Sequence, residues 1–195
     1  ARLYVYAPPG LSLASRADAA GVTLLSKTSL AEALRRYPNA KPILNLDEDW
    51  RFQTDPQKAG LKQNFADPGF NDQEWKSVTA TAYWQDQGFD DYHGTAWYRK
   101  TFTAPPLTED DPLGVDVQHI LLYFGGVDGD AAVYLNGQKI GEHLPSQLGR
   151  GWDQPFILDA TAALKPGRNT IAVQVTKDRY KSGMNKGVTL MLAEK

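Results

Sequence analysis

Residues 95–103 have the sequence Thr-Ala-Trp-Tyr-Arg-Lys-Thr-Phe-Thr, the clearest strand signal in the chain. Trp97 and Arg99 are two positions apart, and Tyr98 lies between them. Because successive side chains of a β-strand point to opposite faces of a sheet, Trp97 and Arg99 are expected on one face and Tyr98 on the other. The aliphatic stem of Arg99 can then cover an aromatic ring on its own face.

Similar short runs continue toward the C-terminus. Each is apolar throughout or alternates apolar with polar residues, and each has the length of a strand: 120–124, 131–135, 155–158, 170–176 and 188–192. Turn signals separate these runs at regular intervals, and helical periodicity is almost absent. This pattern predicts an all-β fold with two packed sheets.

Several turn residues have a definite structural interpretation. Asn136-Gly137 supplies the positive φ angles of a tight hairpin. Gly125-Gly126 permits a sharp bend or a close approach of another backbone segment. Asp159 and Thr161 are expected to accept hydrogen bonds in a turn. These residues indicate a fold rather than a chemical activity.

Residues 1–41 differ from the rest of the chain. Strand-like runs occur at 3–7 and 22–25, an Ala-rich helix is favoured over 11–20, and a second helix is expected from Ser29 until Pro38 stops it. About 40 residues are too few to bury both faces of a sheet. We therefore expect 1–41 to be an α/β appendage or the tail of a preceding domain, and 42–195 to form the β-sandwich.

Composition excludes several classes of function. Among 195 residues, 21 Lys and Arg balance 23 Asp and Glu, which does not fit a nucleic-acid-binding surface. No apolar run approaches the roughly 20 residues that a membrane helix needs. The chain has no cysteine, so disulfides, a thiolate nucleophile and Cys-ligated zinc are excluded. It starts with Ala1 and ends in Ala-Glu-Lys after an apolar run, which suggests a piece excised from a longer polypeptide.

A series of ordered blocks carries a family resemblance. The series begins at Leu-Asp-Glu-Asp-Trp-Arg-Phe (46–52) and continues through 75–78, 84–88, 91–102, 124–128, 132–137, 140–143, 155–156, 159–161 and 164–169, of which Asp-Tyr-His-Gly-Thr-Ala-Trp-Tyr-Arg-Lys-Thr-Phe (91–102) is the most specific. In order and spacing they resemble the sugar-binding domain of glycoside hydrolase family 2, the β-galactosidase and β-glucuronidase group, over about residues 43 to 192. The resemblance implies a galactose-binding-like jelly roll. It also implies that the catalytic glutamates lie in a separate barrel domain of the same polypeptide. It leaves the cellular compartment unknown, with secretion or a bacterial periplasm favoured.

The residues themselves carry no catalytic signature. The three histidines, His93, His119 and His143, are scattered, and the sequence has neither a Gly-x-Ser-x-Gly elbow nor a phosphate-binding loop. Adjacent acidic residues such as Asp90-Asp91 are typical of solvated turns rather than of two carboxyl groups facing each other across a sugar-sized cleft. We therefore expect a non-enzymatic accessory domain, and a self-contained hydrolase is the least favoured alternative.

Sugar binding needs an aromatic ring that stacks on the apolar face of the sugar and polar groups that reach its hydroxyls. Trp50, Trp75 and Trp97 lie in strand-like motifs and are expected in the core. The stacking candidates lie in loops or at strand ends among polar residues: Trp84, Tyr92, Trp152 and Tyr180. The resemblance adds Asp91 and Asp178 as residues that reach a sugar.

Two questions stay open from the sequence. The domain either binds a mono-, oligo- or polysaccharide or packs as a purely structural module beside a catalytic barrel and shapes its cleft. The resemblance also raises the question of a binding site for a structural calcium ion. Calcium takes six to eight oxygen ligands. Its candidate ligands are Asp86, Asp90, Asp91, Asp128 and Asp130, although solvated turn aspartates explain the same residues.

Overall fold

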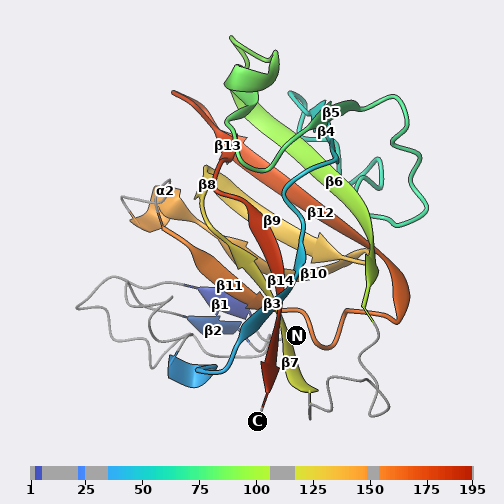
Figure 1. The fold of residues 1–195 in the computed structure, drawn as a ribbon. Coiled ribbons are helices and arrows are strands. Elements are labelled where there is room, and N and C mark those ends of the chain that lie inside the picture. The colour runs from blue at the N-terminus through green and yellow to red at the C-terminus, as the bar shows by residue number, and fades with distance from the viewer. Residues whose placement is uncertain (1–2, 6–21, 25–34, 106–116, 149–153, 195) are drawn as a thin grey trace.

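The computed structural model describes residues 3–5, 22–24, 35–105, 117–148 and 154–194. Its regular structure is almost entirely β-strand, in a six-stranded sheet, a four-stranded sheet and two small two-stranded sheets (Figure 1). Every pairing within the two large sheets is antiparallel. The predicted all-β sandwich is therefore confirmed. Within these ranges, no helix has the length and apolar character that a membrane-spanning helix requires.

The two sheets mix strands from distant parts of the chain. In spatial order, the larger sheet contains β10 (Gln138–His143), β9 (Asp130–Leu135), β12 (Gly167–Lys177), β6 (Gly94–Ala104), β4 (Trp50–Thr54) and β5 (Lys76–Val78). The smaller sheet contains β11 (Phe156–Asp159), β7 (Val117–Phe124), β14 (Val188–Glu194) and β3 (Lys41–Asn45). The short elements are β8 (Val127–Asp128), which pairs with β13 (Gly183–Met184), the 3₁₀-helix η2 (Trp84–Gln87) and α2 (Pro145–Leu148).

The main core lies between the two sheets and follows the period of two expected for strands. Strands β6 and β12 pair along their whole lengths, from Gly94 opposite Lys177 to Ala104 opposite Gly167. Tyr98 of β6 and Val173 of β12 are directly paired and both belong to this core. Trp50 is also fully buried in it, as the sequence predicts. The long β6–β12 pair therefore fixes the register of the larger sheet.

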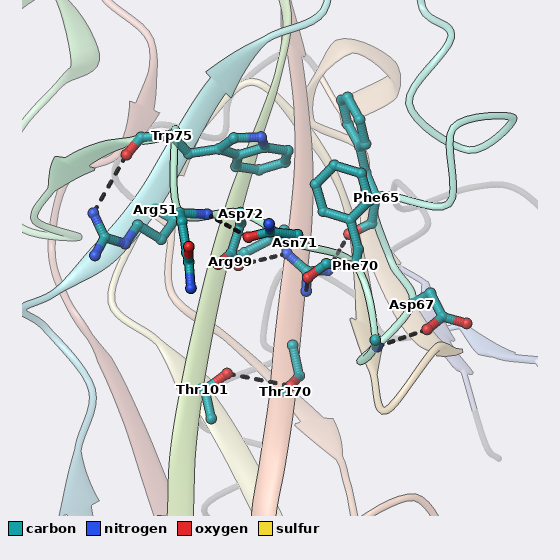
Figure 2. A network of polar contacts seen from close by, with 12 residues as sticks. Arg51, Phe65, Asp67, Phe70, Asn71, Asp72, Trp75, Arg99, Thr101 and Thr170 are labelled. Carbon is teal, nitrogen blue, oxygen red and sulfur yellow. Dashed lines mark hydrogen bonds and ion pairs between the residues drawn. The ribbon is translucent and has the colours of Figure 1, made fainter.

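The outer face of the larger sheet carries a second core, which we call the outer aromatic cluster. It consists of Phe65, Ala66, Trp75, Trp97, Tyr134 and Ala172, with Phe70 packed against it. Arg99 lies on the same face, and its guanidinium carbon is 5.3 Å from the centre of the Phe70 ring and 6.0 Å from that of Trp75 (Figure 2). The prediction that Trp75 and Trp97 are buried is confirmed, and Arg99 meets the aromatic rings through its guanidinium group.

The predicted turns form as expected. Asn136 and Gly137 have φ angles of 52° and 82° and connect β9 to β10. Gly125 hydrogen-bonds to the Gly187 carbonyl at 3.0 Å, and a Cβ atom at Gly125 would overlap the backbone carbonyl of Lys186. Only glycine fits such a close approach of two backbone segments.

The N-terminal segment contributes a small parallel sheet. Strand β1 (Leu3–Val5) pairs in parallel with β2 (Val22–Leu24), and β1 lies beside β10 and β11. The two expected strands are therefore present. The expected helix over 11–20 lies outside the described residues, and so does most of the second one, of which residues 35–36 are helical.

The turn after β11 gives a prediction about acid stability. The Asp159 carboxylate accepts hydrogen bonds from the Thr161 backbone at 2.9 Å and hydroxyl at 2.6 Å, and its other oxygen lies 3.0 Å from Nδ1 of His119. Burial favours the neutral acid, but these hydrogen bonds outweigh burial and hold the pKa of Asp159 below its ordinary value of 3.8. The stabilisation is therefore complete above the pKa of the unfolded chain and is lost as pH falls through the folded-state pKa.

We expect the wild-type chain to lose more unfolding free energy between pH 5 and pH 3 than Asp159→Asn, which cannot titrate. Urea unfolding at the two pH values measures this difference. Asp90→Asn, at an exposed loop aspartate, is the matched control and should keep the wild-type acid sensitivity. Equal acid sensitivity of wild type and Asp159→Asn would contradict the assignment.

Candidate functional site

Most of the predicted sugar-contacting residues gather at one end of the sandwich. Because Gly94 pairs with Lys177, the segment before β6 and the segment after β12 meet there, at the upper end in Figure 1. We call residues 83–93 and 178–185 together the loop end. The predicted site residues that lie on it are Trp84, Asp91, Tyr92, Asp178 and Tyr180. The remaining candidate, Trp152, lies outside the described residues.

Trp84 is a floor residue of the loop end, which means that its ring lies in the core beneath the loops and not on their surface. Its side chain has 0% exposure, its ring centre lies 5.7 Å from that of Phe52, and its indole N–H donates to the Tyr92 carbonyl at 3.0 Å. The sequence offers Trp84 as a stacking candidate in a polar loop, whereas the structure buries its ring. A single turn of 3₁₀-helix turns this ring inward although its neighbours in the sequence are polar. A buried ring offers no face for stacking.

Gln85 connects the segments of the loop end, and sequence reasoning missed it. Its side chain is 8% exposed. The amide nitrogen donates to the carbonyls of Tyr92 at 3.0 Å and Tyr180 at 3.2 Å, while the amide oxygen accepts from the Ser182 N–H at 2.9 Å. Nothing in the sequence marks this glutamine, because its partners include residues 95 and 97 positions away.

Tyr180 projects from the loop end into solvent. It is 78% exposed, whereas Leu61 is the only other mostly exposed large apolar side chain in the described residues. Its φ angle of 62° is unusual for a residue with a side chain, and its carbonyl accepts hydrogen bonds from Gln85 and from the Ser182 hydroxyl at 3.1 Å. The surrounding contacts thus hold an exposed aromatic residue in a strained backbone conformation, a feature that clusters at functional sites.

The loop end also carries charged and polar groups. Lys181 pairs with Asp86 at 2.6 Å, and its ammonium lies 5.6 Å from the centre of the Tyr83 ring. Asp91 and Asp178 are both exposed, one on each segment of the loop end. The loop end therefore presents an aromatic ring together with carboxylates and an ammonium group, a combination that can stack on a sugar and hydrogen-bond its hydroxyls.

Tyr92 is half-buried between the floor and the surface. Its ring centre lies 5.9 Å from that of Trp84, and its hydroxyl donates to the Thr95 carbonyl. Burial raises the pKa of Tyr92 above its ordinary value. Tyr92 therefore serves mainly to hold the loop, with part of its ring accessible.

The five candidate calcium ligands do not converge on one site. Asp86 pairs with Lys181, Asp128 pairs with Lys177, and Asp130 accepts from the Ser146 N–H at 2.9 Å. Across the described ranges, no group of three or more His, Asp or Glu side chains is arranged to hold a metal ion. Asp86, Asp128 and Asp130 therefore bind lysines and a backbone amide, as structural turn residues do.

Comparison with known proteins places the chain in a family. The model of the family described as the β-galactosidase second all-beta domain matches residues 62–181. Among curated relatives, the β-galactosidase of Priestia megaterium is 29% identical over 148 residues, covering 67% of this chain and 14% of that protein. The β-glucuronidase of Formosa agariphila is 31% identical over 150 residues, covering 69% and 13%. The chain thus spans about one seventh of the length of these relatives.

Solved structures support the same fold. The β-glucuronidase of Bacteroides uniformis matches with a TM-score of 0.61 and 24% identity over 79% of this chain and 18% of that one. The β-glucuronidase of Ruminococcus gnavus matches with a TM-score of 0.63 and 21% identity over 78% and 30%. At this identity the structures support the fold alone, while the family match covers more than half of the chain. The chain therefore belongs to the β-galactosidase second all-beta domains, an accessory domain of glycoside hydrolase family 2.

Proposed function

We propose that the chain is a carbohydrate-contacting accessory domain of a larger glycoside hydrolase, and that its loop end makes the contact. The observation that carries this proposal is the exposed ring of Tyr180, held in place by Gln85 and Ser182. Sugars present an apolar C–H face that stacks on such a ring, and Asp178 and Asp91 are exposed on the same loop end to accept hydrogen bonds from hydroxyls.

We also propose that the sandwich is a galactose-binding-like jelly roll. Its strand order supports this, because β12 lies between β9 and β6 and β14 lies between β7 and β3, so neighbouring strands are far apart in the sequence. Fold alone does not assign function, so the sugar contact rests on the loop end and not on the jelly-roll assignment.

The alternative is a purely structural module that packs beside a catalytic barrel and shapes its cleft without binding sugar alone. The same exposed ring favours it, because an apolar side chain fixed on the surface also suits a protein interface. Because the chain covers about one seventh of the length of these relatives, most of a protein like them lies outside this chain. The two functions differ in whether the isolated chain binds sugar.

Tyr180→Ala is expected to weaken sugar binding about 2- to 12-fold, because one stacking contact contributes roughly 0.5–1.5 kcal/mol. The measurement is an NMR titration of the chain with galactosides and glucuronides, with and without calcium, following the signals of residues 178–182. Tyr180→Phe keeps the ring and should bind like wild type. The unfolding free energy of Tyr180→Ala should stay within about 0.5 kcal/mol of wild type, since the ring buries little surface.

Absence of saturable shifts at the loop end across the sugar panel would contradict the sugar contact and favour the structural module. Shifts that persist unchanged in Tyr180→Ala would contradict the stacking role of this ring.

A further inference from the structure

A separate pocket lies on the outer face of the larger sheet, where β4 ends. Its volume is about 460 Å³, within the range of small-molecule sites. The end of β4 and the segment that follows it line the pocket with three glutamines and three aromatic rings: Gln53, Gln57, Gln63, Phe65, Phe70 and Trp75. Figure 2 shows the rings of Phe65, Phe70 and Trp75 gathered near Arg99.

The glutamines give the pocket unused hydrogen-bonding capacity. Gln57 and Gln63 are exposed, and their side-chain amides have no hydrogen-bond partner among the described residues. Gln53 uses its amide nitrogen on the Thr54 carbonyl at 3.2 Å, which leaves its oxygen available. Each carboxamide offers donors and an acceptor side by side, which matches adjacent hydroxyl groups that both donate and accept.

The pocket lining offers no cation for an anionic ligand. Among the described residues, neither Lys nor Arg lines it, and Asp55 is its only charged lining residue. The Asp55 carboxylate is already bound to the N–H groups of Ala59 at 2.8 Å and Gly60 at 2.9 Å and to the Trp97 indole at 3.0 Å. An anionic ligand would therefore meet a carboxylate without a compensating cation, which disfavours uronic acids.

The aromatic side of the pocket is rigid. Arg99 donates to Asp72 at 2.8 Å and to the backbone carbonyls of Phe65 and Phe70, so the segment that carries these rings is tied to β6 (Figure 2). Trp75 packs edge-on against Phe65, with ring centres 4.9 Å apart. A pocket that is already ordered loses little entropy when it binds a ligand.

We propose that this pocket is a second glycan-binding site, selective for neutral sugars over uronic acids. The amides of Gln57 and Gln63 bind sugar hydroxyls, and the half-buried ring of Phe70 contacts the apolar side of the sugar. The proposal goes beyond the loop end and does not depend on Tyr180. The pocket and the loop end lie next to each other, because the Asp55 N–H and the Tyr92 hydroxyl both donate to the Thr95 carbonyl. The experiment must therefore resolve the signals of individual residues.

The test is a ¹H–¹⁵N NMR titration of the 195-residue chain with lactose, methyl β-D-galactopyranoside and D-glucuronic acid. We expect saturable shifts of the Gln57 and Gln63 side-chain amides with the neutral sugars at millimolar concentrations, and affinity for glucuronic acid at least about 10-fold weaker. Changing Gln57→Leu and Gln63→Leu together should weaken neutral-sugar binding about 10-fold. Gln73→Leu, an exposed glutamine of the same segment outside the pocket lining, is the matched control and should bind like wild type.

Three results would overturn the proposal: no saturable shift at Gln57 and Gln63, unchanged affinity of the double variant, or glucuronic acid binding as tightly as lactose. Shifts confined to residues 178–182 would uphold the loop-end function and overturn the second site. Shifts confined to the pocket would uphold the second site and contradict the loop end.

Discussion

Arg99→Met is expected to lower the free energy of unfolding by about 3 kcal/mol, the lower end of the cost of removing one partner of a buried ion pair, because Asp72 is 24% exposed. The Arg99 side chain is 1% exposed and donates to Asp72 at 2.8 Å and to the Phe65 carbonyl. Its removal leaves the Asp72 carboxylate without its cation and the buried carbonyl without a donor. Methionine fills a similar volume, so the loss reports the polar contacts rather than a cavity.

Urea unfolding followed by tryptophan fluorescence measures this loss, because Trp75 and Trp97 belong to the outer aromatic cluster. Arg51→Met is the matched control on neighbouring β4. Arg51 is exposed, and among the described residues its side chain makes one hydrogen bond, to the Trp75 carbonyl at 3.3 Å, so its loss should cost less than about 1 kcal/mol (Figure 2). Arg99→Lys should fall between the two, because lysine keeps the charge but lacks the planar fork that reaches several acceptors. Equal stability of Arg99→Met and Arg51→Met would contradict the role of the buried network.

The main features of the sandwich could be predicted because they depend on local sequence. The alternation of Trp97, Tyr98 and Arg99 places these residues on opposite faces of β6, as the structure confirms. Asn136-Gly137 determines a hairpin through its own backbone angles. The complete burial of Arg99 could not be predicted in the same way, because it depends on Asp72, which lies 27 residues earlier in the chain.

The candidate site was predictable only in part. The sequence marks Tyr180 as an aromatic residue in a polar loop, and the structure places it in solvent. Trp84 has the same kind of polar sequence context but lies in the core, because η2 turns its ring inward. Gln85 carries no signal at all, since its role depends on carbonyls and an N–H from other loops. The difference between these residues arises from tertiary contacts that sequence periodicity does not encode.

Trp84→Ala is expected to lower the free energy of unfolding by about 3–5 kcal/mol, the usual cost of truncating a buried tryptophan. The substitution opens a cavity against Phe52 and Tyr92 and removes the indole donor from the Tyr92 carbonyl. Urea unfolding gives the loss directly. Because the Gln85 amide still donates to the same carbonyl, the hydrogen-bond part of the loss should be small beside the cavity part.

Trp84→Phe separates the cavity part of the stability loss from the hydrogen-bond part. It also tests whether Trp84 contributes to sugar binding at the loop end. It keeps an aromatic ring in the core but has no N–H, so it should cost clearly less than Trp84→Ala. If Trp84 is a floor residue and Tyr180 the contact, Trp84→Phe should keep sugar affinity within about 2-fold of wild type, whereas Tyr180→Ala loses affinity and keeps stability. The reverse pattern, with a stable Trp84→Ala that fails to bind sugar, would mean that Trp84 reaches the ligand and that the loop end opens in solution.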